Sequence, residues 1–184
     1  MSTPGVMPQV TSWNIDPAHS TAEFKIRHMM ISNVKGHFSG ITGSLMLNEA
    51  DVTRSAVDAS IDVASLNTRE PQRDAHLKSA DFFDAEKFPK LSFKSTRVTR
   101  DAQGELLVTG DLNIHGVTRS VVFTVESLSE PAKDPWGNTR VGLSATTKIN
   151  RKDFGLTWTA ALETGGVLVG DEVTISLDVQ FIKA

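Results

Sequence analysis

The chain has 184 residues, a formal net charge of -3 and no cysteine; 39% of its residues are hydrophobic and 22% are charged. This length suits one domain with a substantial core. The lack of cysteine excludes disulfides and thiolate chemistry, and the charge gives no strong attraction to nucleic acid, so no nucleic-acid partner is expected. No apolar run approaches the roughly 20 residues of a membrane-spanning helix, so no stable membrane insertion is expected.

The first residues predict a short tail before the domain. Residues 1–11 are rich in Pro, Gly, Ser, Thr and Val, so we expect a flexible tail at 1–11 and a single domain at 12–184. Because the N-terminus lacks a basic region followed by an apolar run, we expect no secretory signal and a cytoplasmic protein. Trp13 and Ile15 share one side of an extended segment, and Asp16 is expected to bond to the amides of the turn that follows.

Most of the remaining chain alternates apolar and polar residues, as half-buried strands do. His28 shares the apolar face of the segment 21–30 and is expected to be a hydrogen-bonded interior histidine. The segment 34–47 is interpreted as one long strand whose glycines predict bulges or bends. Further alternating segments lie at 54–63, 91–95, 106–114, 119–125, 141–149 and 173–181.

The period changes between residues 65 and 93. Pro71 suits the first turn of a helix. Phe82 and Phe83 follow on a polar connection and need an apolar surface to cover. We predict a short helical insertion around residues 68–84 that covers one mouth of a barrel.

The fold class is predicted to be all-β. We count eight strands with short sequential connections, which favour antiparallel neighbours. Eight such strands close well into an up-and-down barrel without exposed edges, whereas a two-sheet sandwich is the competing architecture. Glycines inside the strands favour the barrel. Its inner face mixes large with small residues, which suits either an elongated cavity or a packed interior.

Recognisable catalytic and metal-binding motifs are missing from the sequence. No HExxH, GxSxG, CxxC or lysine-containing phosphate loop occurs. The histidines, at positions 19, 28, 37, 76 and 115, are widely spaced. We therefore expect neither a metal site nor a catalytic residue set.

Short motifs along the chain resemble, in order, those of the YceI-like family. They include Trp13-x-Ile15-Asp16-Pro17, Arg73-Asp74-x-His76-Leu77, Asp81-Phe82-Phe83-Asp84, Gly110-Asp111-Leu112-x-Ile114 and Asn150-Arg151-x-Asp153-Phe154-Gly155. The ordered set covers nearly the whole chain from residue 13. The resemblance implies an extended lipocalin-like barrel whose hydrophobic interior holds a long isoprenoid-type lipid, such as a polyprenyl phosphate or a quinone tail. It also makes a homodimer plausible.

The leading hypothesis is non-enzymatic binding, carrying or storage of such a lipid, with no other cofactor. Phe82 and Phe83 would close over the ligand, and its head group would need polar partners at the mouth. An ion pair between Arg73 and Asp74 that holds the helical segment is the structural alternative for those residues. The predicted ligand-binding residues are Phe24, Ile26, His28, Phe38, Leu45, Ile61, Arg73, His76, Phe82, Phe83, Phe93, Leu112, Ile114, Phe123 and Leu143.

Two other classes of function stay open at this point. An enzyme acting on a small apolar substrate would use His28 or His76 as general base, with a carboxylate to orient the imidazole. A packed barrel would instead serve protein contacts, with Trp136 and Trp158 as interface anchors.

Overall fold

The computed structural model describes residues 10–160, 162 and 168–184, so most of the predicted tail at 1–11 lies outside the described residues. In that part of the chain a 12-stranded antiparallel sheet carries one α-helix, α1 (Pro71–Lys78). The strands are β1 (Val10–Ile15), β2 (Thr21–His28), β3 (Ser32–Phe38), β4 (Ile41–Asn48), β5 (Ala56–Asp62), β6 (Leu66–Asn67), β7 (Lys90–Arg100), β8 (Leu106–Ile114), β9 (Val117–Leu128), β10 (Ala132–Lys133), β11 (Thr139–Asn150) and β12 (Val169–Lys183). Short 3-10 helices lie at Pro17–His19, Val52–Arg54, Val63–Ser65 and Arg151–Phe154.

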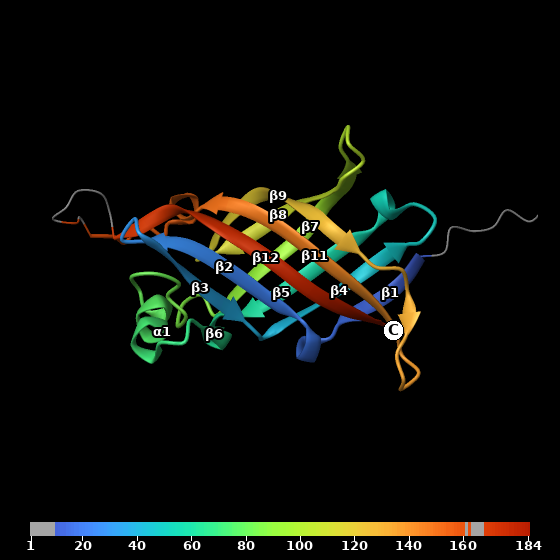
Figure 1. Cartoon of the computed structure of the whole chain (residues 1–184), viewed down its shortest axis with the longest axis horizontal. Helices are drawn as coiled ribbons and strands as arrows, with labels where there is room; N and C mark the ends of the chain where they lie inside the picture. The colour runs from blue at the N-terminus through green and yellow to red at the C-terminus, as the bar shows by residue number, and fades with distance from the viewer. Residues whose placement is uncertain (1–9, 161, 163–167) are drawn as a thin grey trace, which may run out of the picture.

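Eight of the strands close into a ring, which confirms the predicted barrel (Figure 1). Its order is β1-β4-β5-β7-β8-β9-β11-β12, and β12 returns to β1. The N-terminal part of β12 pairs with β2 instead of β1, and β3 and β6 extend the sheet beyond β2. β11 pairs with β12 from Arg140 opposite Ile182 to Asn150 opposite Glu172, and this pairing closes the ring.

The segment 34–47 is not one strand, so that prediction was wrong. The chain bends at Ser39 and Gly40, and a Cβ on Gly40 would lie 3.1 Å from the Cβ atoms of Asp62 and Ser65. β3 therefore pairs with β2 and β6, whereas β4 pairs with β1 and β5. The glycine bend was predicted, but the shift in phase from Gly36 and Phe38 to Ile41 and Leu45 was not interpreted as a break between two strands.

The helix α1 forms inside the predicted helical insertion. Pro71 opens it, and the Glu70 carboxylate accepts hydrogen bonds from the backbone amides of Gln72 and Arg73. These bonds satisfy amide groups that would otherwise lack partners at the helix start. None of the residues of α1 is fully buried, so its position depends on the contacts that attach it to the barrel rim.

One end of the barrel is filled by side chains. Trp13 is fully buried there, and it packs in one cluster with Val141 and Phe181. Its indole Nε1 donates a hydrogen bond to Thr11 Oγ1 at 2.8 Å, which satisfies the polar atom of this large side chain. This end is therefore closed by packing.

A charged cluster lies beside the closed end. Arg140 Nη1 donates to Asp16 Oδ2 at 2.6 Å, and Arg140 Nε donates to Asp134 Oδ2 at 2.7 Å. Arg140 is the main reason that the pKa of each carboxyl falls to about 2, and His19 lowers that of Asp16 further. Asp16 also accepts from the Ala18 amide, as its turn position predicted.

Replacing Trp13 by alanine tests whether packing closes this end. We expect W13A to lower the free energy of unfolding by about 3–5 kcal/mol, because removal of a fully buried indole leaves a cavity that cannot collapse completely. Urea unfolding followed by circular dichroism measures the change. W136A is the matched control: Trp136 is 79% exposed, so its removal should change stability by less than about 0.5 kcal/mol. Equal effects of the two variants would contradict this assignment.

The charged cluster should make stability depend on pH in a defined window. Since both carboxyl pKa values lie below the ordinary 3.8, their stabilisation is fully present above about pH 4. It is lost as the pH falls through about 2. R140M should therefore be less stable than the parent at neutral pH, with the difference shrinking toward pH 2.

Urea midpoints measured across that range give the result. K90M, which removes an exposed ion pair with Asp62, is the control and should show little effect at any pH. A difference between R140M and the parent that stays constant down to about pH 2 would show that the two carboxylates do not produce it.

Candidate functional site

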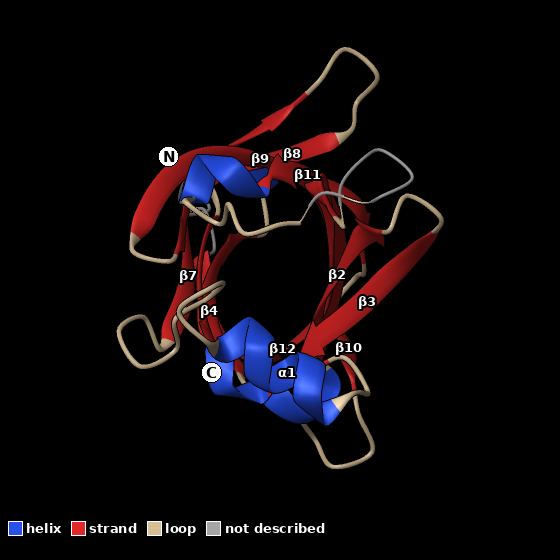
Figure 2. Ribbon diagram, turned by 90° about the vertical axis from the view of Figure 1, so that its left-hand side faces the viewer, coloured by secondary structure: helices blue, strands red, loops and turns tan. Residues whose placement is uncertain are grey.

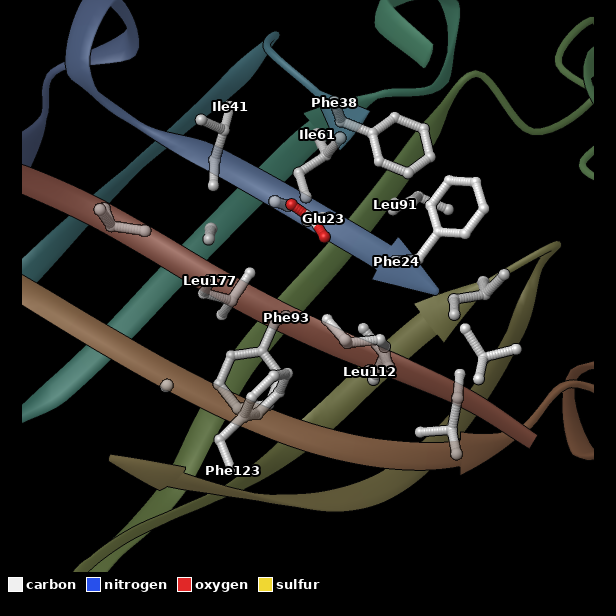
Figure 3. Close-up of a pocket in the computed structure, with 18 of the residues that line it drawn as sticks. Glu23, Phe24, Phe38, Ile41, Ile61, Leu91, Phe93, Leu112, Phe123 and Leu177 are labelled. Atoms are coloured by element: carbon white, nitrogen blue, oxygen red, sulfur yellow. The ribbon is translucent and has the colours of Figure 1, made fainter. Parts of the chain in front are cut away.

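The barrel encloses an elongated cavity of about 500 Å³. Its wall comes from the inner faces of the ring strands and of β2 and β3, and α1 contributes at one end. Figure 3 shows that Phe24, Phe93, Phe123 and Leu177 reach it from different strands. The alternation that forms half-buried strands therefore produces a continuous apolar wall once the sheet closes.

Large and small side chains share this wall. The rings of Phe93 and Phe123 meet edge to face with centroids 5.1 Å apart. A Cβ on Gly110 would lie 2.5 Å from the Phe93 ring, so glycine at that position makes room for it. Ala59 and Ala145 leave further space across the barrel, and the interior is consequently not filled.

Every residue predicted to bind ligand lines this cavity. Ligand contact at each of them stays a prediction. The prediction omitted much of β12, where Val173, Ile175, Leu177 and Val179 also line the wall. Their regular alternation could have identified them, whereas Trp158 lies in a segment without periodicity and carried no such signal.

Polar side chains collect at the end of the cavity opposite Trp13. His28, Gln72, Arg73 and His76 line it there, at the C-terminal end of β2 and along α1. Figure 2 looks toward this end, with α1 along one side of the ring of strands. The cavity thus has one apolar closed end and one polar mouth.

Thr68 attaches α1 to the barrel. Its amide and hydroxyl donate to Asp74 Oδ1 at 2.8 and 2.5 Å. Arg73 donates from Nε to the Thr68 hydroxyl at 2.9 Å and from Nη2 to the Thr68 carbonyl at 2.6 Å. The expected direct ion pair between Arg73 and Asp74 was therefore wrong in its geometry, because both side chains bind the 3%-exposed Thr68.

An aromatic cluster covers part of the mouth. The imidazole of His76 packs edge-on against Phe82 and Trp158, with centroid distances of 5.1 and 4.7 Å. Phe83 packs against Phe38 of β3 at 5.8 Å. Trp158 is half-buried and lines the cavity, whereas Trp136 is 79% exposed, and the use of either as an interface anchor stays a prediction.

The two histidines of the mouth differ in their partners. His76 Nε2 lies 2.9 Å from Asp81 Oδ2, which meets the geometric requirement stated for a general base. For His28, the hydrogen bonds between described residues include none to the imidazole, contrary to expectation. Among the same residues, no group of three or more His, Asp or Glu side chains could hold a metal ion.

Arg151 is a buried cation beside the mouth. It donates to the carbonyl oxygens of Leu156 at 2.6 Å, Gly170 at 2.7 Å and Val169 at 3.3 Å. Burial lowers the pKa of its guanidinium, and nearby Asp171 opposes that shift. Arginine stays protonated in proteins, so these carbonyl bonds compensate a buried charge.

None of the helices formed by the described residues has the length and apolar character needed to cross a bilayer.

Comparison with known proteins gives a consistent set of relatives. A UPF0312 protein of Staphylococcus aureus is 37% identical over 173 residues, which are 94% of this chain and 98% of that protein. The structure of BcnA from Burkholderia cenocepacia matches with a TM-score of 0.77 and 22% identity, covering 90% of this chain and 98% of that one.

A polyisoprenoid binding domain from Saccharophagus degradans shares the fold, with a TM-score of 0.66 and 16% identity over 96% of this chain and all of that one (100%). The model of the YceI-like domain matches residues 13–181. With the barrel, the cavity and the ordered motifs, this match shows that the chain belongs to the YceI-like domain family.

Proposed function

We propose that this protein binds a long isoprenoid-type lipid in its barrel, without catalysis, and thereby carries or stores it. The observation that supports this most directly is the form of the cavity, which is elongated, apolar along its wall and closed at the Trp13 end. A ligand that fits it has a long apolar tail and one polar end.

The energetics agree with such a ligand. Each Å² of apolar surface removed from water contributes roughly 25 cal/mol, so burial of an extended tail gives tight binding with few polar contacts. The cavity volume of about 500 Å³ lies within the roughly 300–1,000 Å³ of small-molecule pockets. The Saccharophagus degradans neighbour, which is a polyisoprenoid binding domain, supports the same ligand class through the shared fold.

The polar mouth is proposed to hold the head group. His28 and His76 both line the cavity at that end and are the first partners we assign. Arg73 lines the same region, but its Nε and Nη2 atoms already bind Thr68, which leaves only its remaining N–H groups for a ligand. Phe82 and Phe83 then cover the chain of the lipid just inside the head group.

Catalysis on a small apolar substrate is the second candidate function. It rests on one contact, between His76 Nε2 and Asp81 Oδ2, in a side chain that reaches the cavity. A general base of this kind would lose most of its turnover in H76A. A substrate screen in which the parent turns over no compound faster than H76A would remove this candidate. The lipid-binding proposal would still stand.

Filling the cavity should abolish lipid binding. We expect A145F to lower the fraction of purified protein that carries lipid by at least about tenfold, because Ala145 is 4% exposed and lines the wall. Organic extraction and native mass spectrometry of parent and variant measure it. S144F is the matched control: the neighbouring side chain lies on the opposite face of β11.

A second filling variant, A59L, guards against misfolding of A145F, since it adds volume on the opposite wall. Folded filling variants that retain as much lipid as the parent would contradict a ligand inside the barrel. A parent protein that never yields lipid on extraction would contradict the proposed function itself.

Loosening α1 should speed lipid exchange if α1 and the Phe82-Phe83 segment gate the mouth. T68V removes the hydroxyl that binds Asp74 and Arg73, which should cost about 1–3 kcal/mol in local opening. Hydrogen exchange over residues 70–83 and native mass spectrometry of lipid release report the two effects. T118V, which removes an exposed hydroxyl that accepts from Asn113, is the control. Faster amide exchange with unchanged lipid release would place the entrance elsewhere.

A further inference from the structure

The turn between β2 and β3 exposes large apolar side chains. Met29, Met30 and Ile31, which we call the hairpin tip, are 41, 53 and 75% exposed. They are consecutive, so their side chains form one projecting apolar group. Single exposed apolar residues are ordinary on a protein surface, but a cluster at the end of a hairpin indicates a contact surface.

The residues of the hairpin tip are also unusual for their backbone conformation. Met29 and Met30 have φ values of 52° and 61°, and the Ile31 amide donates to the His28 carbonyl at 3.2 Å. Turns with positive φ at both central positions favour Asn-Gly or Asp-Gly, because other side chains are strained there. Methionine at both positions is therefore not explained by the needs of the turn.

Cations line the outer face of the same hairpin. Lys25 and Lys35 lie directly opposite each other across β2 and β3, an arrangement of like charges that destabilises a sheet. Arg27 continues this face toward the hairpin tip, and its Nη2 donates to the Met30 carbonyl at 3.1 Å. In the part of the chain that the structure describes, no ion pair includes these cations.

Acidic groups near this face leave it with a net positive charge. Asp171 lies near Arg151 and Lys152, and Glu172 lies near Lys148. Glu23 shares the outer face of β2 and lines one surface hollow with Lys25 and Lys35, but it is a single carboxylate beside the cations Lys25, Arg27 and Lys35. An apolar tip with a net positive face behind it is complementary to a surface that is anionic outside and apolar beneath.

The hairpin tip adjoins the mouth of the cavity. His28, the residue directly before it, lines the cavity, and the Met29 amide donates to the carbonyl of Leu168, which also lines it. The turn that joins β2 to β3 lies at the same end of the barrel as α1 (Figure 1). A surface that receives the hairpin tip would therefore lie next to the mouth.

We propose that the hairpin tip docks on the surface of an anionic lipid bilayer, with Met29, Met30 and Ile31 in the interfacial region and the basic face of the hairpin over the lipid head groups. The choice of a bilayer as the occupant rests on the proposed lipid-binding function, because a lipid carrier must meet its ligand at a membrane. The contact is peripheral and reversible, and it orients the cavity mouth toward the source of the ligand.

Vesicle flotation with the full chain tests this docking. The probes are phosphatidylcholine vesicles with and without phosphatidylglycerol. We expect binding to the anionic vesicles only. The combined variant M29N, M30N and I31S should bind roughly tenfold more weakly or worse, since asparagine tolerates positive φ while removing the apolar surface. K25Q with K35Q should lose about fivefold for each cation.

The matched control is M46S with V122S, which removes apolar side chains that are 44 and 46% exposed at other places. It should bind like the parent. Equal binding of the parent and the tip variant, or no binding of the parent to anionic vesicles, would overturn the docking. So would a dimer of the parent that is lost in the tip variant, because a second copy would then cover the hairpin tip.

Vesicle flotation and lipid extraction distinguish failure of the docking from failure of the proposed function. A parent that yields lipid on extraction but does not float with anionic vesicles overturns the docking and leaves lipid binding in place. A parent that floats through its hairpin tip but never carries lipid overturns the proposed function, while its membrane contact stands.

Discussion

Pairing of β11 with β12 is the constraint on which the rest of the structure depends. It runs from Arg140 opposite Ile182 to Asn150 opposite Glu172, and it converts a long sheet into a ring. Closure pairs the backbone N–H and C=O groups at the two edges of the ring and turns one face of every ring strand inward. The cavity is a consequence of that closure, because the inward faces carry alanine and glycine beside phenylalanine.

Alternation of apolar residues predicted the strands and most of the wall, since period two directly reports which face a side chain occupies. The choice of a barrel over a sandwich rested on the glycines inside the strands and on the resemblance of the motifs. Alternation also marked the break at Gly40, where the buried positions shift from even numbers in β3 (Gly36 and Phe38) to odd numbers in β4 (Ile41 and Leu45), but a shift in phase does not say which strands become the new partners. Nor could alternation identify Trp158, whose place beside His76 depends on the path of a loop between distant strands. A local sequence pattern shows which face of a strand a side chain occupies, whereas contacts between distant segments decide which strands are neighbours.

The two ends of the barrel are built by different means. Packing around Trp13 and the bonds of Arg140 hold the closed end, where Trp13, Val141 and Phe181 are almost fully buried. The mouth is held by a few hydrogen bonds to Thr68 and by edge-to-face aromatic contacts around His76. Such contacts are individually weak, so we expect local opening at the mouth to require less free energy than opening at the closed end. This asymmetry agrees with the proposed binding of a lipid through one entrance.

Arg151 holds the connection that leads into β12. Its guanidinium joins the carbonyl of Leu156 to those of Val169 and Gly170, so one side chain fixes both ends of the connection that leads into β12. We therefore expect the register of β12 to tolerate insertions and deletions between those ends, since lengthening a loop adds only slowly to the entropy cost of closing it. Such changes would alter the rim at low cost to the barrel.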